Sequence, residues 1–177
     1  YPNINLVITT ADETDPEIDF SIRFGNPQWP DMVMRKLTTL SFFPVCSPSL
    51  LNGPNRIRHP SDLIHHVLLD SLDGSHWQDW NAFVGVEAPM DKLCLRFSDF
   101  NHIIEAARSG LGIAMGDSVT VGMDLKVGTL VKPLSQSLLS PTVSYYVLTS
   151  PSRSLSKPAQ NVVDWIFAEI SRMETLD

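Results

Sequence analysis

The chain has 177 residues, 43% of them apolar, and its 20 acidic and 13 basic side chains give a net charge of −7. This composition is typical of a globular protein with one α/β domain or two small subdomains, and it argues against an intrinsically disordered chain. A surface of this charge repels phosphate backbones, so we expect no direct contact of this segment with DNA. No apolar run approaches the ~20 residues that a membrane-spanning helix needs, so no membrane partner is expected.

The start of the sequence and its cysteines indicate where the protein works. Tyr1 begins directly in a strand-like pattern, without the basic region that opens a signal peptide. The sequence also begins without an initiator methionine, which favours a fragment of a longer chain. The only two cysteines, Cys46 and Cys94, lie among apolar residues. We therefore expect reduced, buried thiols in a cytoplasmic protein.

The first half of the chain is predicted to hold four strands. Apolar residues alternate with other residues over 4–8 and again over 18–24, and the second of these strands ends at Gly25. A further apolar strand is predicted to end at Cys46, and residues 67–70 predict a buried strand. The pattern of strands separated by loops and helices favours a layered α/β fold.

The second half alternates helices with strands. Aromatic residues at helical spacing predict a short helix with a buried aromatic face, made of Trp77, Trp80 and Phe83. Leu93, Leu95 and Phe97 predict a strand, and another strand is predicted over 145–149. The last helix is expected to turn four apolar side chains inward, namely Val162, Ile166, Ile170 and Met173.

Residues 98–118 predict a helix, a turn and a buried strand, which is half of an α/β crossover unit. Ser98 or Asp99 can cap the helix, because each side-chain oxygen can accept a hydrogen bond from a first-turn amide. Gly110 suits the left-handed residue that ends a helix, and Gly112 allows a close turn. The apolar face of this helix is predicted to contain Phe100, Ile103, Ile104 and Ala107.

Several of these segments resemble the effector-binding domain of LysR-type transcriptional regulators. Residues 106–115 are similar to the family pattern A-A-x-x-G-x-G-[IV]-A-[LM], and residues 19–25 resemble D-[LF]-[AS]-I-R-[YF]-G. Residues 44–51 resemble P-V-C-S-P-x-L-L, and residues 60–63 resemble P-x-D-L. The resemblance covers essentially the whole chain.

The resemblance implies an α/β fold of two Rossmann-like subdomains with mostly parallel sheets and flanking helices. This fold is like that of type 2 periplasmic binding proteins, with two crossover strands that join the subdomains. Subdomain I is expected to comprise residues 1–45 and 146–177, and subdomain II residues 46–145. The family's domain begins with a further strand and helix that this sequence lacks, and a polar ligand contact between them is expected to be missing.

The expected site lies beyond the carboxyl ends of strands, where helix N-termini offer free N–H groups to a ligand. Three strand ends are expected to converge there, at Arg23-Phe24-Gly25, at Val45-Cys46-Ser47 and at Ser98-Asp99 with Asn101. The resemblance implies that Ser98, Asp99, Asn101 and His102 contact the effector. The loop at Gly116-Asp117 and the strand residues Tyr145 and Tyr146 are expected to border the same cleft.

Two ambiguities remain within this set. Capping of the helix would by itself explain Ser98 and Asp99. Tyr145 and Tyr146 are neighbours on a strand and face opposite sides of it, so at most one of them faces the cleft.

Catalytic and metal-binding patterns are not found. Residues 70–76 contain aspartates, serines and His76, but no G-x-S-x-G segment frames either serine, so we interpret them as a polar surface loop and expect no enzyme activity. No H-x-x-x-H or C-x-x-C pair occurs, so no metal is expected. No phosphate-binding glycine loop of the usual kind occurs either, and no cofactor is expected.

The resemblance implies a sensory domain that binds a small-molecule effector in its cleft and works as a homodimer or tetramer. DNA would be bound only through a winged helix-turn-helix domain that precedes Tyr1. A solute-binding protein of a transporter has the same architecture and is the alternative. The positive end of the 100–109 helix, Arg23, Asp99 and Asp117 together favour a zwitterionic or polyhydroxyl effector, such as an amino acid or a peptide-like molecule.

Overall fold

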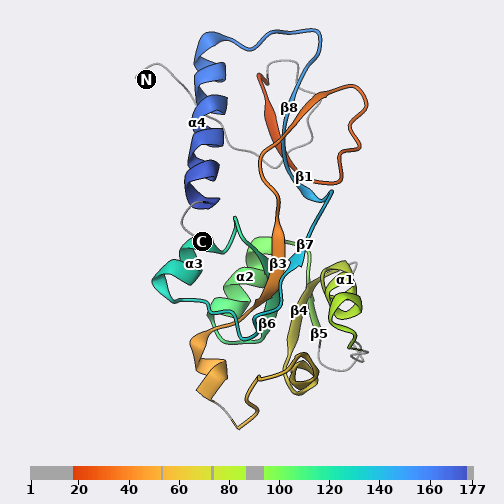
Figure 1. Cartoon of the computed structure of the whole chain (residues 1–177), viewed down its shortest axis with the longest axis vertical. Coiled ribbons are helices and arrows are strands. Elements are labelled where there is room, and N and C mark those ends of the chain that lie inside the picture. Colours follow the sequence, from red (N-terminus) through yellow and green to blue (C-terminus); the bar gives the residue numbers. More distant parts are fainter. Residues whose placement is uncertain (1–17, 53, 73, 87–93, 175–177) are drawn as a thin grey trace. The chain divides into compact units, whose positions relative to one another are not determined.

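The computed structural model describes residues 18–52, 54–72, 74–86 and 94–174 (Figure 1). The strand predicted over 4–8 and the side chains of Leu93 and Met173 lie outside this described part. The chain divides into two compact units. Unit 1 contains the described residues up to 39 and from 141 onward, and unit 2 contains those between 40 and 140. The crossings predicted after residues 45 and 145 lie a few residues beyond these boundaries.

Unit 1 has an antiparallel sheet of three described strands and a long helix. The strand order is β1 (Ser21–Gly25), β8 (Ser144–Thr149), β2 (Val33–Lys36), and the helix is α4 (Lys157–Glu174). The central strand β8 is the most buried, whereas the outer strands keep exposed apolar side chains such as Phe24 and Val33. In α4 the fully buried residue is Val163, while the expected Val162, Ile166 and Ile170 are half-buried.

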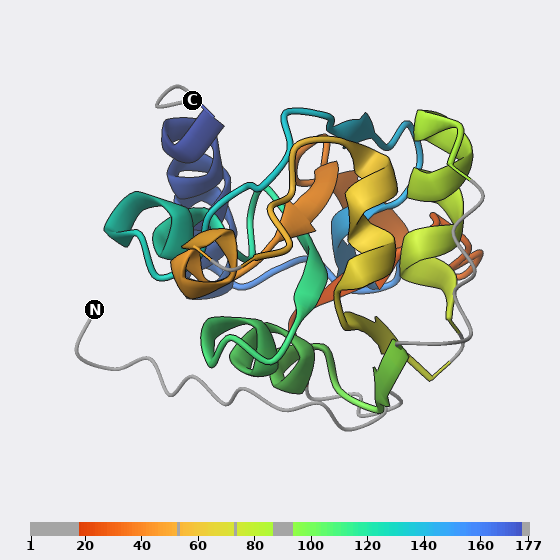
Figure 2. The ribbon, with the colours of Figure 1, turned by 90° about the horizontal axis from the view of Figure 1, so that it is seen from below.

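Unit 2 has a five-stranded sheet with helices on both faces (Figures 1 and 2). The strand order is β5 (Cys94–Phe97), β4 (Leu68–Ser71), β6 (Ile113–Asp117), β3 (Ser41–Val45), β7 (Leu138–Leu139). The helices are α1 (Ser75–Val84), α2 (Phe100–Arg108), α3 (Gly122–Val127) and the 3-10 helices η1 (Pro48–Asn52) and η2 (Pro60–His65).

Two apolar cores lie on the two faces of this sheet. Leu69 and Ala114 pack with α2, whereas their strand neighbours Leu68 and Ile113 pack with α1 and η2. Successive residues of a strand point to opposite faces, so this alternation places α2 on one face and α1 on the other. Figure 2 shows α2 and α1 apart on either side of the strands.

The expectation of a mostly parallel sheet is corrected to a mixed one in the described part of the chain. β4 pairs in parallel with β5 and β6, but β3 pairs antiparallel with β6 and β7. Parallel neighbours need a long crossover connection, which the chain makes through α1 and α2. β3 follows directly on the segment that comes from unit 1, and no such crossover sets its direction.

The predicted helix and turn within 98–118 are confirmed. The N–H of Asn101 donates to Oδ1 of Asp99 over 2.7 Å, which makes Asp99 the cap, and Ile103, Ile104 and Ala107 are buried. Gly110 has φ +78°, the left-handed conformation that suits glycine. At Gly112 a Cβ atom would lie 2.5 Å from the carbonyl oxygen of Val67, so only glycine fits this turn.

The predicted aromatic face of α1 is right for two residues and wrong for the third. Trp77 and Trp80 are fully buried and their rings meet edge to face, but Phe83 is 52% exposed. A step of three residues turns an α-helix by about 300°, so Phe83 lies roughly 120° around the helix from Trp77. Its side chain therefore leaves the face that packs on the sheet.

Candidate functional site

The carboxyl ends of β4, β5 and β6 share one edge of unit 2, which we call the carboxyl edge. It is formed by the last residues of these strands, Ser71, Phe97 and Asp117, because the three strands are parallel. The first residue of β3 lies at the same edge, where Ser118 N–H donates to the Ser41 carbonyl over 3.2 Å. The chain enters and leaves unit 2 here.

The segment Val45-Cys46-Ser47 lies at the opposite edge of the sheet. Val45 is in register with Ala114 near the start of β6, and a Cβ atom at Gly110 would lie 3.8 Å from Cβ of Ser47. The expected convergence of this strand end with the others is therefore wrong, because β3 runs antiparallel to β6. Val45 and Cys46 are fully buried, and burial raises the pKa of the Cys46 thiol to about 11.

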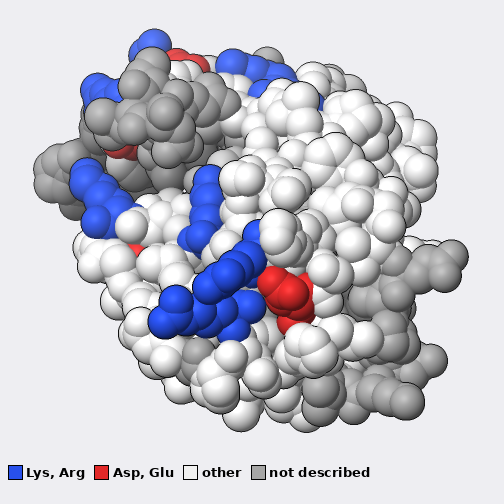
Figure 3. All heavy atoms as spheres, turned by 60° about the horizontal axis from the view of Figure 1, so that its bottom comes forward, with Lys and Arg blue, Asp and Glu red and all other residues white. Residues whose placement is uncertain are grey.

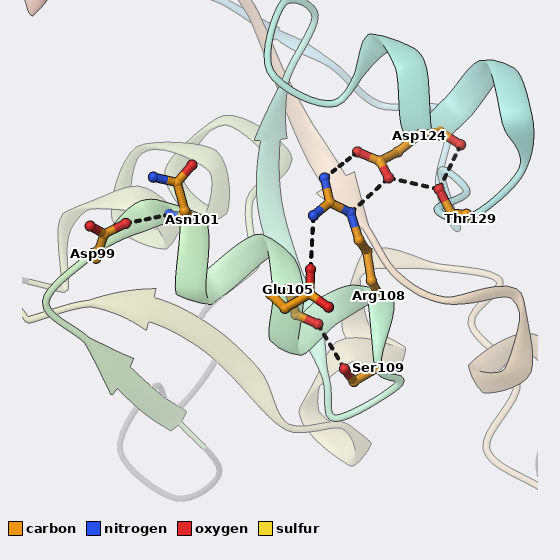
Figure 4. A network of polar contacts seen from close by, with 7 residues as sticks. All are labelled: Asp99, Asn101, Glu105, Arg108, Ser109, Asp124 and Thr129. Carbon is orange, nitrogen blue, oxygen red and sulfur yellow. Dashed lines mark hydrogen bonds and ion pairs between the residues drawn. The ribbon is translucent and has the colours of Figure 1, made fainter. Parts of the chain in front are cut away.

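The N-terminus of α2 is exposed at the carboxyl edge (Figure 4). Ser98, Asp99, Asn101 and His102 are all exposed. The Asp99 side chain accepts a hydrogen bond from one first-turn N–H group, that of Asn101. The geometry of a helix leaves further first-turn N–H groups without intrahelical partners. This end of α2 can therefore donate hydrogen bonds to an acceptor group such as a carboxylate.

Gly116 and Asp117 are built into the packing behind this edge. A Cβ atom at Gly116 would lie 3.1 Å from Val121 and Val45, so the position has no room for a side chain. Asp117 is 2% exposed, and its Oδ1 accepts the N–H groups of Val119 at 2.9 Å and Thr120 at 3.0 Å. Its Oδ2 accepts the Thr120 hydroxyl. The carboxylate thus stabilises the turn that follows β6.

An ion-pair network holds α2 against α3 (Figure 4). Arg108 Nε lies 2.7 Å from Asp124 Oδ1, and Nη2 lies 2.8 Å from Oδ2. Arg108 also donates to Glu105 over 2.9 Å, and the Thr129 hydroxyl donates to Asp124 Oδ1 over 2.7 Å. These hydrogen bonds, that from Arg108 above all, lower the pKa of Asp124. The network fixes the last turn of α2, and with it the direction in which the helix presents its N-terminus.

The candidate residues of unit 1 lie on the paired strands β1 and β8. Phe24 is in register with Tyr145, and their ring centroids are 5.2 Å apart. Arg23 is in register with Tyr146, which is buried and donates its hydroxyl to the Thr142 carbonyl over 2.6 Å. Tyr146 is therefore committed to the unit's own structure. Tyr145, beside the exposed Phe24, is the better placed of the two tyrosines for a ligand.

These residues lie near the end of unit 1 from which the chain continues to unit 2. Gly25 is in register with Ser144, whose hydroxyl donates to the Thr38 carbonyl over 2.5 Å. The N–H of Leu37 donates to the Tyr145 carbonyl over 2.9 Å. The connecting segment at residues 37–38 is thus hydrogen-bonded to the same part of β8 that carries Tyr145.

The sequence places Asp70 both at the end of the buried strand predicted over 67–70 and at the start of the polar surface loop predicted over 70–76. The strand is confirmed and the loop is wrong at this residue, because Asp70 lies in β4 with 1% exposure. Within the described ranges, no group of three or more His, Cys, Asp or Glu side chains could hold a metal ion. No helix in the described part of the chain is long and apolar enough to cross a bilayer.

A comparison with protein families decides the relationship. The sequence model described as "LysR substrate binding domain" matches residues 1–171. The chain belongs to this family. Among LysR-family relatives, the glycine cleavage system transcriptional activator of Escherichia coli (strain K12) is 30% identical over 173 residues, which cover 96% of this chain and 56% of the relative. The HTH-type transcriptional activator AmpR of Providencia stuartii is 29% identical over 177 residues, covering 97% and 58%.

Solved structures agree with the assignment to the LysR family. The AmpR effector binding domain from Citrobacter freundii matches with a TM-score of 0.80 and 26% identity, covering 97% of this chain and 86% of that one. The regulatory domain of AphB in Vibrio vulnificus matches in fold, with a TM-score of 0.64, 24% identity and coverage of 95% and 84%. The chain spans a little more than half the length of the curated relatives described above, which are transcriptional activators. They support the regulator over the solute-binding alternative.

Proposed function

We propose that this LysR-family domain is the small-molecule sensor of a DNA-binding transcriptional regulator that works in the cytoplasm and catalyses no reaction. The family match over residues 1–171 carries this proposal, together with transcriptional activators as relatives. A winged helix-turn-helix domain outside this segment would bind the DNA. The regulator would assemble as a homodimer or tetramer, which sedimentation of the purified domain can test.

The effector would bind at the carboxyl edge of unit 2. On the side of unit 2, the exposed N-terminus of α2 offers amides, the Ser98 hydroxyl and the Asn101 amide. Within unit 1, Phe24 and Tyr145 form an aromatic pair. An effector that binds one conformation of the domain more tightly than another would shift the equilibrium towards that conformation.

The division into subdomains supports this placement. Unit 1 and unit 2 are joined by two chain segments, at residues 39–40 and 140–141. The candidate residues of unit 2 lie at the edge where these segments enter, and β8 of unit 1 is hydrogen-bonded to the segment before residue 39. A ligand bound at this edge would lie near the residues through which the chain enters unit 2.

The charges favour a zwitterionic effector such as an amino acid or a small peptide-like molecule. The N-terminus of α2 carries a partial positive charge and suits a carboxylate. Asp99 is exposed at the same end and would attract an ammonium or hydroxyl group. Asp117 does not take part in this attraction, because its oxygens are occupied by Val119 and Thr120.

A thermal-shift screen of the domain against amino acids, cell-wall fragments and aromatic acids is the first experiment. A ligand that binds only the folded protein raises its melting temperature, by an amount that grows with the logarithm of ligand concentration over Kd. Calorimetry then gives the affinity of each hit. If no small molecule stabilises the domain, or if the true effector is a dianion, the proposed function or its ligand class is wrong.

A further inference from the structure

The carboxylate of Asp70 is buried with one oxygen unused. Its Oδ1 accepts the N–H of Ser71 over 2.8 Å, whereas Oδ2 has no hydrogen-bond partner among the described residues. A carboxylate removed from water without full hydrogen bonding is costly, and such groups normally have a partner. The position of Asp70 at the end of β4 places this unused oxygen close to the carboxyl edge.

His76 connects Asp70 to the N-terminus of α2. Its Nδ1 lies 3.5 Å from Asp70 Oδ1 and makes no hydrogen bond to any residue that the structure describes. Its ring meets the ring of Phe100, the first residue of α2, edge to face with centroids 5.8 Å apart. A carboxylate, an imidazole and an aromatic ring thus lie in succession, and all three can bind a cationic nitrogen.

Arg96 is a cation on the strand next to Asp70. The two residues are partners on the parallel strands β4 and β5. A Cβ atom at Gly74 would lie 3.3 Å from a guanidinium nitrogen of Arg96 and 3.9 Å from Asp70 Oδ2. The exposed arginine side chain and a glycine without side chain therefore border the approach to Oδ2. A ligand that moves Arg96 aside would reach the carboxylate.

We propose that Asp70 and His76 form a subsite for the ammonium group of the effector, and that the nearby guanidinium of Arg96 competes with this group for the approach to Asp70. The inference rests on the proposed function and specifies the chemistry of the same site. The N-terminus of α2 takes the carboxylate of the ligand, and Asp70 takes its nitrogen. The ligand class is an amine-bearing carboxylate, and a carboxylate without an amino group binds only half of the site.

The test is a titration of the whole domain with methylammonium, glycine and L-alanine. The chemical shift of the Ser71 amide in NMR spectra is monitored at each addition. The Ser71 N–H donates to Asp70 and reports on its surroundings. Saturable shifts are expected with all three amines, and the amine-free propionate should leave Ser71 unchanged. Asp70→Asn should weaken amine binding by about tenfold or more, because a hydrogen bond to a charged group is lost.

Two variants make the result decisive. Arg96→Gln removes the competing cation and should bind methylammonium several times more tightly, which tests the inference even if Asp70→Asn does not fold. Asp164→Asn makes the same charge change as Asp70→Asn but lies on α4 of unit 1, where Asp164 accepts a hydrogen bond from Gln160. This control should leave the affinity for methylammonium unchanged.

The failures of the two proposals differ. If no amine shifts Ser71, or if amines bind the Asp70→Asn variant as well as the native domain, the ammonium subsite is wrong. The proposed function survives that outcome when another molecule of the thermal-shift screen stabilises the domain. If nothing in the screen binds at all, the sensor function itself is overturned.

Discussion

Four aspartates of unit 2 carry the same formal charge and have four different environments. Asp99 caps α2 at the surface, Asp117 is enclosed by the turn after β6, and Asp124 is paired with Arg108. Asp70 is buried with an oxygen to spare. Partners rather than residue type thus decide which carboxylate is available to a ligand, and we assign that role to Asp70.

The Ser98 hydroxyl tests the position of the site. Ser98→Ala should weaken effector binding by about 1–2 kcal/mol if this hydroxyl bonds the ligand. The matched control is Ser109→Ala at the other end of α2, where the hydroxyl donates to the Glu105 carbonyl over 2.9 Å (Figure 4). Calorimetry with the identified effector measures both variants. Equal affinity of Ser98→Ala and the native domain would remove Ser98 from the site.

The ion pair of Asp124 predicts a dependence of stability on pH. The hydrogen bonds from Arg108 and Thr129 lower the pKa of Asp124 in the folded state below the value of about 3.9 in an unfolded chain. Its contribution is therefore complete above about pH 4 and is lost as the pH falls through the lower folded value. Asp124→Asn should reduce the free energy of unfolding at pH 7 by on the order of 1 kcal/mol, since Arg108 is partly exposed.

Urea unfolding at pH 7 and near pH 3 checks this prediction. The difference between Asp124→Asn and the native domain should shrink at the acid pH, because the carboxylate of the unfolded chain takes up a proton there before that of the folded one. Glu105→Gln removes the exposed partner of the same arginine and should cost at most about 0.5 kcal/mol. A difference that stays constant with pH would contradict the ionic role of Asp124.

At the scale of elements, α2 is defined by its ends. Asp99 starts it, Gly110 ends it, and its apolar stripe packs on β4 and β6. The chain then turns at Gly112 against the backbone of Val67, the residue just before β4. This contact sets the distance between β6 and β4, and therefore the place of the whole crossover in the sheet.

Gly112→Ala should destabilise the domain by about 2–3 kcal/mol. The added Cβ would lie 2.5 Å from the Val67 carbonyl oxygen and 3.0 Å from Leu69, so backbone atoms must move. The control is Gly128→Ala, where φ is +79° and no atom lies within 4 Å of the added Cβ. Strain alone should cost about 1 kcal/mol there. Urea unfolding measures the free energy of unfolding of both variants. An equal loss of stability in the two would refute the packing argument.

At the scale of the whole molecule, we expect this segment not to bind DNA. Its net charge is −7, although Figure 3 shows several Lys and Arg side chains gathered on one face with acidic side chains beside them. Such a group neutralises few phosphates, and the total charge opposes binding. A gel shift at low salt measures this. A complex with duplex DNA that dissociates as salt rises would show that the basic group acts as a nucleic-acid surface.

Local sequence patterns determined the family and the elements that carry it. The capped helix and its apolar stripe, the turn at Gly110 and Gly112, and the buried strand after it depend on contacts between residues close in sequence. Caps, helical spacing and glycine conformations act within one or two turns, so they can be recognised without knowledge of the fold. The same holds for the opposite facing of Tyr145 and Tyr146.

Tertiary structure alone decided how these elements combine into a candidate site. The direction of β3 is set by pairing with β6, some seventy residues later in the chain, and this removes Val45, Cys46 and Ser47 from the carboxyl edge. The pairing of Asp70 with Arg96 likewise depends on β5, which comes later in the chain. Strand pairing and burial result from contacts between residues far apart in sequence, and no local pattern specifies them.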